Sequence, residues 1–454
     1  MSNYVRLSEL IKSVSITHKF DKEELVFLNT SDVLEGKILI NHYSKVSELK
    51  GQAKKTIKNG DILYSEIRPK NKRYAYVKEI SNVEDYVVST KLMVLRNNSK
   101  LLDTDYLYHF LTNEYTINYL QKRAENRIGS FPQITFDVLK TLQIWLPDNS
   151  VQKSIAKVLS DLDSKIELNN RINRELEAMA KTLYDYWFVQ FDFPFDFAQG
   201  KPNEQGKPYK ASGGKMVYNS ELKREIPEGW ENGTLGDISD LVRGVTYDAN
   251  DIKEENDYDV IPILRATNIS GNVIDFDNMV FVPKQNVSAN QVLNRFDILI
   301  TMSSGSKDHI GKNGFFYFDK EVAFGAFCAK IVAKDKYRFY VYSYTQSDFM
   351  FSTIKNECLG TNINNLNGSL VKGFKLVIPP ADLLEKFNDK VLSIYEMIGV
   401  NHKQNQQLTE LRDWLLPMLM NGQVTVKEAE ERLSSSAELS RSMAAEPSFE
   451  YKKG

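Results

Sequence analysis

The chain has 454 residues, of which 42% are hydrophobic and 26% charged, a composition typical of a globular protein with two or more domains. Its formal net charge is −2, so a nucleic-acid function would need local basic patches or a basic partner. No run of about 18 apolar residues occurs, and the first residues lack the pattern of a signal peptide. With only two cysteines, Cys328 and Cys358, the sequence predicts a cytoplasmic protein with reduced thiols and no membrane segment.

Residues 1–148 predict a first globular module. Short β-branched and aromatic runs alternate there with Gly, Asn and Asp, a pattern typical of strands joined by turns. Residues 105–124 have instead the period of an amphipathic helix. This combination favours an α+β fold with a mostly antiparallel sheet.

Residues 149–189 predict one long helix. Between residues 151 and 188 there is neither Pro nor Gly, and apolar residues recur at steps of three and four, as in a heptad seam. Asn169 and Asn173 occupy two successive positions in the middle of this seam. A buried Asn there would fix register and orientation at a cost in stability, and the alternative is that both lie on a solvated stripe.

The rest of the chain repeats the same order of elements. Residues 190–229, rich in Gly, Pro and Lys, predict a linker with little structure of its own. A second globular module is expected over 230–380 and a second long helix over 381–422. Residues 423–454 form a polar tail with at most a short helix.

Five sequence blocks recur in the same order in the two halves. For example, the block 26–33 resembles 262–269, and the block 59–69 resembles 295–305, both at one common offset along the chain. Order and spacing together indicate that the chain is a tandem duplication.

The two long helices are expected to pair with each other. Asn401 and Asn405 occupy the seam positions of the second helix that correspond to Asn169 and Asn173 in the first. Both Asn pairs lie near the middle of their helices, so antiparallel packing would bring them together. Helices of this length span roughly 50–60 Å, and we expect them to hold two modules at opposite ends about a pseudo-twofold axis. Two different modules on such a spacer have the geometry of a bipartite DNA reader.

Candidate DNA contacts are loop residues with basic or hydrogen-bonding side chains, because phosphate contacts position a protein and base contacts specify sequence. The densest basic loop, 64–73, follows a predicted strand, and 301–307 is its counterpart in the second module. Residues 127–130 and 360–364 form a second matched pair. A solvated loop is the simpler interpretation of any one residue, whereas the matched loops as groups favour DNA contact. The candidates are Ser65, Arg68, Lys70, Lys72, Arg73, Arg127, Ser130, Arg243, Tyr247, Arg265, Asn268, Ser303, Ser304, Ser306, Lys307, Thr361 and Asn362.

Aromatic residues lie near the end of each long helix. Trp187 in the first helix and Trp414 in the second could pack against a module or form a surface for a partner protein, and both interpretations stay open. With the four seam Asn residues, they are the candidates for helix pairing and partner docking.

In its arrangement the chain resembles the specificity subunit of type I restriction–modification systems. The resemblance covers residues 1 to about 422 and is carried first by the order module, helix, module, helix. It is also carried by the motif LGDI at 235–238, with a looser counterpart at 7–10, and by the DIL segments that begin at Asp61 and Asp297.

Further motifs carry the same resemblance. The turns IGS at 128–130 and LGT at 359–361 match, and so does the segment 206–230, which is similar to the central segment of that family. One departure is Tyr4, which stands where the second module has Trp230 at the start of a Trp-Glu-x-x-x-Leu pattern.

The resemblance implies two target-recognition domains on double-stranded DNA, separated by conserved helices. Those helices would form the binding platform for modification subunits, expected to number two, which carry S-adenosylmethionine and the methyltransferase site. Restriction subunits with translocase and nuclease activity, ATP and Mg²⁺ would complete the complex. No cofactor is expected on this chain itself.

Catalytic motifs are missing from the sequence. It contains neither an Asn/Asp-Pro-Pro-Tyr/Phe stretch nor a G-x-x-x-x-G-K-[ST] phosphate loop. Its five His residues are isolated and lack metal-ligand spacing. We therefore expect a non-catalytic recognition subunit without a metal site.

Two other functions fit the duplicated architecture. A stand-alone bipartite DNA-binding regulator would bind DNA with full, salt-dependent affinity in the absence of partners. A protein-binding scaffold would not bind DNA with or without partners.

Overall fold

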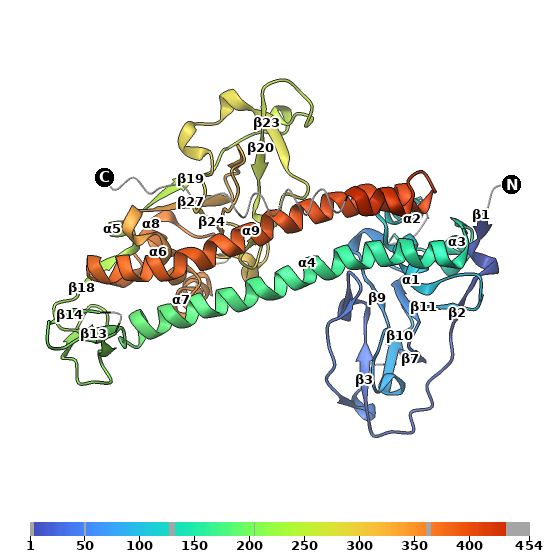
Figure 1. The fold of residues 1–454 in the computed structure, drawn as a ribbon, viewed down its shortest axis with the longest axis horizontal. Coiled ribbons are helices and arrows are strands. Elements are labelled where there is room, and N and C mark those ends of the chain that lie inside the picture. Colours follow the sequence, from blue (N-terminus) through green and yellow to red (C-terminus); the bar gives the residue numbers. More distant parts are fainter. Residues whose placement is uncertain (1–3, 50, 127–131, 204, 360–364, 433–454) are drawn as a thin grey trace. The chain divides into compact units, whose positions relative to one another are not determined.

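The computed structural model describes residues 4–49, 51–126, 132–203, 205–359 and 365–432. Two long helices dominate it: α4 over Asn149–Tyr184 and α9 over Ala381–Met420 (Figure 1). A short π-helical turn, Asp185–Val189, continues α4. The chain forms two compact units, and each long helix contributes to both of them.

The first unit comprises residues 1–167 and 404–454. Its antiparallel sheet has the strand order β2-β11-β8-β9, with β2 at Ile11–Val14, β11 at Leu92–Asn97, β8 at Ile62–Ser65 and β9 at Tyr74–Tyr76. A second sheet has the order β6-β3-β10-β7, with β6 at Ser44–Lys45, β3 at Glu24–Leu28, β10 at Tyr86–Ser89 and β7 at Ala53–Thr56. Strands β3 and β10 are parallel, and β1 (Tyr4–Arg6) pairs with β12 (Gln143–Trp145) near the start of α4.

The second unit, residues 168–403, repeats this topology. Its antiparallel sheet has the order β19-β27-β24-β25, with β19 at Ser239–Arg243, β27 at Cys328–Ala333, β24 at Ile298–Thr301 and β25 at Asn313–Phe315. A parallel pair recurs in β20 (Val260–Leu264) and β26 (Ala323–Phe324), with β23 (Val280–Pro283) on the other edge. Strand β18 (Glu231–Thr234) pairs with β28 (Lys375–Ile378), as β1 does with β12.

The register of the central strands is also repeated. Leu92 opposes Ser65 in the first unit, and Cys328 opposes Thr301 in the second. The residue numbers of the two pairs differ by the same offset as the repeated sequence blocks. Matching order and register confirm the predicted pair of α+β modules.

The predicted helix over 105–124 is two helices, α1 (Thr104–Thr112) and α2 (Glu114–Glu125). The break falls at Asn113, whose side-chain oxygen accepts a hydrogen bond from the backbone N–H of Thr116 at 2.7 Å and so caps α2. The second unit has the same break between α6 (Arg338–Thr345) and α7 (Asp348–Leu359).

The core of the first unit joins the module to both long helices. Buried residues of α4, such as Leu159 and Leu162, lie in one cluster with Leu415 and Leu419 of α9 and with the α1–α2 pair. The Arg412 guanidinium bonds the Asp163 carboxylate at 2.8 Å in the same unit.

In the second unit the helix pairing is antiparallel. The amide Nδ2 of Asn401 donates to Oδ1 of Asn173 at 2.7 Å, and the rings of Tyr184 and Phe387 lie 6.5 Å apart. Residue numbers thus rise along α4 as they fall along α9. The predicted antiparallel direction is confirmed for these residues.

The expectation that residues 190–229 have little structure is wrong. They form a three-stranded sheet of β13 (Pro194–Asp196), β14 (Lys201–Pro202) and β15 (Lys207–Pro208) and a hairpin of β16 (Met216–Asn219) and β17 (Arg224–Pro227). The physical reason is aromatic burial: Phe193 stacks on Tyr209 at 4.8 Å and on Trp230 at 5.2 Å, and Phe193 is 2% exposed. The sequence did not reveal this aromatic packing, because the Gly and Pro residues of the segment are also typical of flexible linkers.

The start of the tail is also ordered. Residues 426–432 are helical, and Ala429 is buried in the core of the first unit. Residues 433–454 of the predicted tail lie outside the described part of the chain.

Candidate nucleic-acid interface

The basic loop of the first module leaves β8 at Ser65. Arg68 and Lys70 are exposed, and neither side chain contacts an acidic group of the described residues. A one-turn 3₁₀ helix at Pro69–Asn71 packs against α2, where the Gln121 side-chain oxygen accepts from the Lys70 N–H at 3.1 Å. The loop is therefore fixed at its base while its two cationic side chains face solvent.

Of the other three candidates in this loop, Ser65 and Arg73 have structural roles. Ser65 is 3% exposed, and its hydroxyl accepts from the Ile67 N–H at 3.1 Å, so a direct base contact by Ser65 is contradicted. Arg73 is half-buried and donates to the carbonyl oxygens of Ser31 and Val33 at 2.9 and 3.3 Å. Lys72 stays exposed near Glu35, 3.5 Å away, and remains a phosphate candidate.

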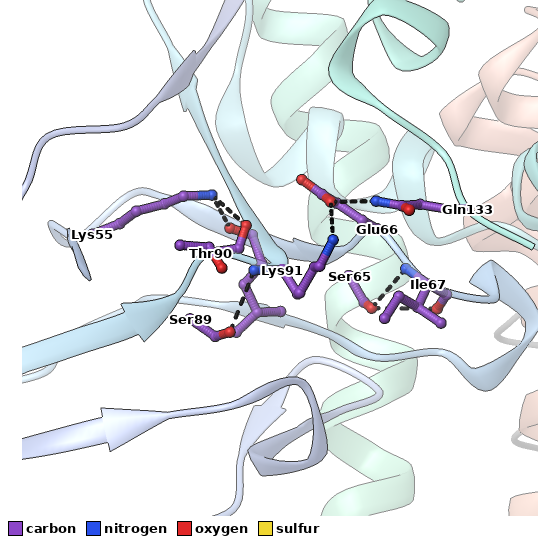
Figure 2. Close-up of polar contacts among 9 residues, drawn as sticks. Lys55, Ser65, Glu66, Ile67, Ser89, Thr90, Lys91 and Gln133 are labelled. Atoms are coloured by element: carbon purple, nitrogen blue, oxygen red, sulfur yellow. Dashed lines mark hydrogen bonds and ion pairs between the residues drawn. The ribbon is translucent and has the colours of Figure 1, made fainter. Parts of the chain in front are cut away.

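Next to this loop lies a polar cluster that the sequence interpretation missed. Figure 2 shows Glu66, Lys91 and Gln133 converging from the end of β8, the β10–β11 turn and the segment after residue 131. The Gln133 amide donates to Glu66 Oε2 at 2.7 Å, and the Lys91 ammonium lies 3.9 Å from the same oxygen. Their wide sequence separation hid the cluster, although each residue lies within a block shared by the two halves.

Lys55 supports the turn that carries Lys91. Its ammonium donates to the carbonyl oxygens of Thr90 and Leu92 at 2.9 and 2.8 Å (Figure 2). Burial lowers the pKa of Lys55, while the nearby Glu66 carboxylate acts in the opposite direction. Lys55 is consequently a structural cation, and Lys91 is the exposed one.

In the second module, Arg243 and Tyr247 flank a close approach between two backbone segments. Gly244 lies so near Gly325 that a Cβ would collide with the carbonyl oxygen of Gly325. The Val245 N–H donates to the Phe324 carbonyl at 2.7 Å, which holds this loop beside the β26–β27 turn. Arg243 is exposed and Tyr247 half-buried, so both remain candidates.

Asn268 and Arg265 have structural roles instead. Asn268 is 1% exposed, and its amide donates to Asp275 Oδ1 at 3.0 Å and to the Asp277 carbonyl at 2.7 Å. Arg265 donates through Nη2 to the Asn278 carbonyl at 2.5 Å. Burial contradicts base contact by Asn268, since a buried amide with satisfied hydrogen bonds cannot reach DNA.

The loop after β24 carries the serine candidates. The backbone N–H of Ser303 donates to the Phe327 carbonyl at 3.1 Å, and Ser304 Oγ accepts from the Ser306 N–H at 3.2 Å. Ser306 is exposed, whereas Ser303 and Ser304 are half-buried. The backbone of Lys307 starts a 3₁₀ turn, Lys307–His309.

Four candidates lie outside the described residues. They are Arg127, Ser130, Thr361 and Asn362.

The helix candidates divide by burial. Asn169 and Asn173 are 1% and 4% exposed, and Asn401 and Asn405 are half-buried, so the interpretation of a solvated stripe is wrong for the first helix. This burial follows from the packing of α4 into the core of the second unit.

The two Trp residues also differ. Trp187 is 2% exposed and packs 6.0 Å from the Phe387 ring, so core packing is right for this residue and partner docking is wrong. Trp414 is 37% exposed, with the Arg432 guanidinium 4.3 Å from its ring. Trp414 therefore remains a docking candidate.

Across the described part of the chain, no group of three or more His, Cys, Asp or Glu residues could hold a metal ion. No helix among the same residues is long and apolar enough to cross a membrane. The Cys328 thiol is free and buried, and burial raises its pKa to about 12.

Comparison with known proteins matches this architecture to one family. The model of the type I restriction modification DNA specificity domain matches residues 2–178 and 227–410. The chain is 30% identical to the type I restriction enzyme HindI specificity subunit of Haemophilus influenzae, over 91% of this chain and 97% of that protein. It is also 30% identical to the EcoKI specificity subunit of Escherichia coli, over 45% of each chain.

Solved structures give weaker similarity. The S subunit of a type I system from M. genitalium aligns with a TM-score of 0.45 and 17% identity, covering 92% of this chain and 95% of that one. The HsdS subunit of Thermoanaerobacter tengcongensis aligns with a TM-score of 0.36 and 17% identity, covering 93% and 97%.

The duplicated α+β modules and the two long helices define a class of two-module proteins. The extent of the family match and of the HindI alignment shows that the chain belongs to the type I restriction–modification DNA specificity family. It is a non-catalytic DNA sequence-recognition subunit.

Proposed function

We propose that each module binds one half of a bipartite site on double-stranded DNA. The observation that carries this proposal is the repetition of one topology with different loop residues. Strand order β2-β11-β8-β9 recurs as β19-β27-β24-β25, while the loop with Arg68 and Lys70 is replaced by the serine loop after β24. Two similar scaffolds with different loops would read two different half-sites.

The long helices are proposed to dock modification subunits. In the second unit, Met179 and Met397 are 58% and 52% exposed, and Val400 is 42% exposed, on helices whose opposite sides are buried. Exposed apolar side chains on a helix pair favour a protein partner.

The first unit offers a pocket instead. A pocket of about 410 Å³ is lined in part by Trp145, Val151, Ile155 and Val424. With one surface in each unit, the chain would bind two modification subunits.

The proposal assigns all chemistry to partner subunits. S-adenosylmethionine and the methyltransferase site would belong to the modification subunits, and ATP, Mg²⁺, translocase and nuclease activity to the restriction subunits. This chain would supply recognition in the cytoplasm, where its two thiols stay reduced. Membership of the specificity family disfavours a stand-alone regulator and a protein-only scaffold.

The docking proposal is tested with the double variant Met179→Glu/Met397→Glu. Two carboxylates on the apolar surface should weaken binding of a modification subunit by about 10-fold or more, because each would have to be desolvated. Titration calorimetry with purified modification subunit measures this change.

The control is Tyr218→Glu, at a position of the same unit that is 65% exposed and lies on the β16–β17 hairpin rather than on α4 or α9. It should bind like the wild type. Unchanged affinity of the double variant would contradict docking at this surface, and methylation without sequence preference by the assembled complex would contradict the recognition proposal.

A further inference from the structure

The two modules carry the same frame of backbone hydrogen bonds at the ends of their central strands. In the first module, the Glu66 N–H donates to the Lys91 carbonyl at 3.0 Å, and the Ile134 N–H donates to the Glu66 carbonyl at 2.8 Å. An isolated bridge joins Ile67 to Gln133. Three separate segments thereby meet at one point.

The second module repeats this frame with different residues. The Met302 N–H donates to the Phe327 carbonyl at 2.9 Å, and the Leu366 N–H donates to the Met302 carbonyl at 2.7 Å. A bridge joins Ser303 to Asn365, as one joins Ile67 to Gln133. Met302, Phe327 and Asn365 are thus the structural counterparts of Glu66, Lys91 and Gln133.

The side chains on the shared frame differ in chemistry. The first module presents a carboxylate that contacts both an ammonium and an amide (Figure 2). The second presents a thioether and a phenyl ring at the positions of the carboxylate and the ammonium, and keeps an amide at Asn365, and Phe327 is 66% exposed. Residues that determine sequence specificity need a backbone that stays the same in both modules and side chains that differ between them. These positions have both properties.

The Glu66 carboxylate is built to accept a hydrogen bond from outside the protein. Gln133 and Lys91 both meet its Oε2, and Oε1 has no hydrogen-bond partner among the described residues. Lys91, whose side chain is 47% exposed, offsets the negative charge that would otherwise be repelled by DNA. In the major groove, a carboxylate pairs with the exocyclic amino group of a base, typically N4 of cytosine.

Phe327 cannot read a base by hydrogen bonding. An apolar side chain in the major groove instead contacts the C5-methyl group of thymine. Met302, its partner in the backbone frame, is half-buried, and the Met302 N–H donates to the Phe327 carbonyl, so the backbone at Phe327 is fixed while its ring is exposed. Such exposure of a phenyl ring is unfavourable in water and favourable against a methyl group.

We infer that these matched positions determine specificity by different chemistry in the two modules. Glu66, oriented by Gln133 and Lys91, reads an exocyclic amino group in one half-site, and Phe327 with Met302 reads a thymine methyl group in the other. This inference rests on the proposed function that each module binds one half-site.

The test is base-resolution mapping of the motif methylated by the complete complex. Glu66→Gln should lower discrimination at one position of one half-site by about 5-fold or more and leave the other half unchanged. Phe327→Ser should do the same in the other half only. Glu24→Gln and Tyr258→Ala, exposed residues of the same two modules, should leave the motif unchanged.

A second measurement isolates the methyl group. Replacing thymine by uracil in the half-site read by the second module should weaken binding of the wild-type complex by about 5-fold or more, and should not affect Phe327→Ser. Equal binding of thymine and uracil DNA by the wild type would overturn methyl readout, as would a half-site without thymine.

The methylation motifs of the wild type and the two variants distinguish failure of this inference from failure of the proposed function. A bipartite wild-type motif that neither Glu66→Gln nor Phe327→Ser alters would overturn the inference alone. A wild-type complex without a bipartite motif would overturn the proposed function. Thermal melting of both variants verifies that they fold.

Discussion

A buried carboxylate stabilises each recognition frame at its base. Asp61 is 1% exposed and receives two hydrogen bonds from Arg96, at 2.6 and 2.7 Å, and one from the Lys58 N–H at 2.8 Å. Its counterpart Asp297 pairs with Lys330 at 2.9 Å. In each module the pair joins the two strands whose far ends carry the recognition residues.

Asp61→Ala should destabilise the first unit by about 3–5 kcal/mol, because Arg96 would keep a partly buried charge without a partner. Chemical unfolding measures the change. Lys78→Ala removes an exposed pair with Asp105 and should cost about 1 kcal/mol or less. Equal losses for the two variants would contradict a special role for the buried pair.

For single residues, the sequence predicted which loops carry exposed basic side chains better than it predicted the role of each polar residue. Arg68 and Lys70 are exposed as expected, but Ser65 and Asn268 use their hydrogen bonds on the backbone around them. Ser and Asn next to turns serve equally as caps and as DNA contacts, and one sequence does not distinguish the two. Glu66 has no distinguishing signal in the sequence, because only folding brings Gln133 beside it.

Among the elements, the long helices were the most predictable, since their seam extends over many turns. The heptad pattern does not predict how the Asn side chains between the two helices bond. Asn401 donates to Asn173, but Nδ2 of Asn173 is buried without a hydrogen-bond partner among the described residues. An Asn pair with an unpaired buried N–H group costs stability but fixes the register in which α4 and α9 pack together.

Asn401→Ala should cost about 1–3 kcal/mol, because the Asn173 oxygen loses its donor in a buried place. The double variant Asn173→Leu/Asn401→Leu should be at least as stable as the wild type, since both polar groups are replaced by apolar ones. Urea unfolding compares the three proteins. A double variant as unstable as the single one would exclude this account of the seam.

His402 gives the same helix pair a pH dependence. Burial lowers its pKa to about 4, and its ring stacks on Tyr317 at 5.4 Å. The unfolded chain, with a His pKa of about 6.5, binds the proton more readily than the folded one. The stabilising contribution is thus full above about pH 6.5 and declines as the pH falls toward 4.

The expected loss from His402 is about 2 kcal/mol between pH 7 and pH 5. His402→Phe keeps an aromatic ring but has no group that binds a proton. Between pH 7 and pH 5 the unfolding free energy of this variant should therefore fall by about 2 kcal/mol less than that of the wild type. Unfolding free energies at both pH values measure the difference. Parallel pH profiles of variant and wild type would contradict this account, because they would show that His402 binds its proton equally well in the folded and unfolded chain.

For the whole molecule, the duplication was the decisive sequence signal, because blocks that recur at nearly constant offsets predicted two modules of one topology. Strand order and register confirm it. What the sequence concealed was the structure of residues 190–229, where aromatic packing is masked by Gly and Pro. Recognition chemistry was also hidden, since it depends on contacts among three distant segments.

The central claim is that the two modules contact different halves of one DNA site. A photo-crosslinking amino acid is introduced at Lys70 in the first module or at Ser306 in the second, two exposed positions, in the complex assembled on its mapped target. The account predicts that the probe at Lys70 crosslinks one half-site and the probe at Ser306 only the other. Crosslinks from both probes to the same half-site would contradict it.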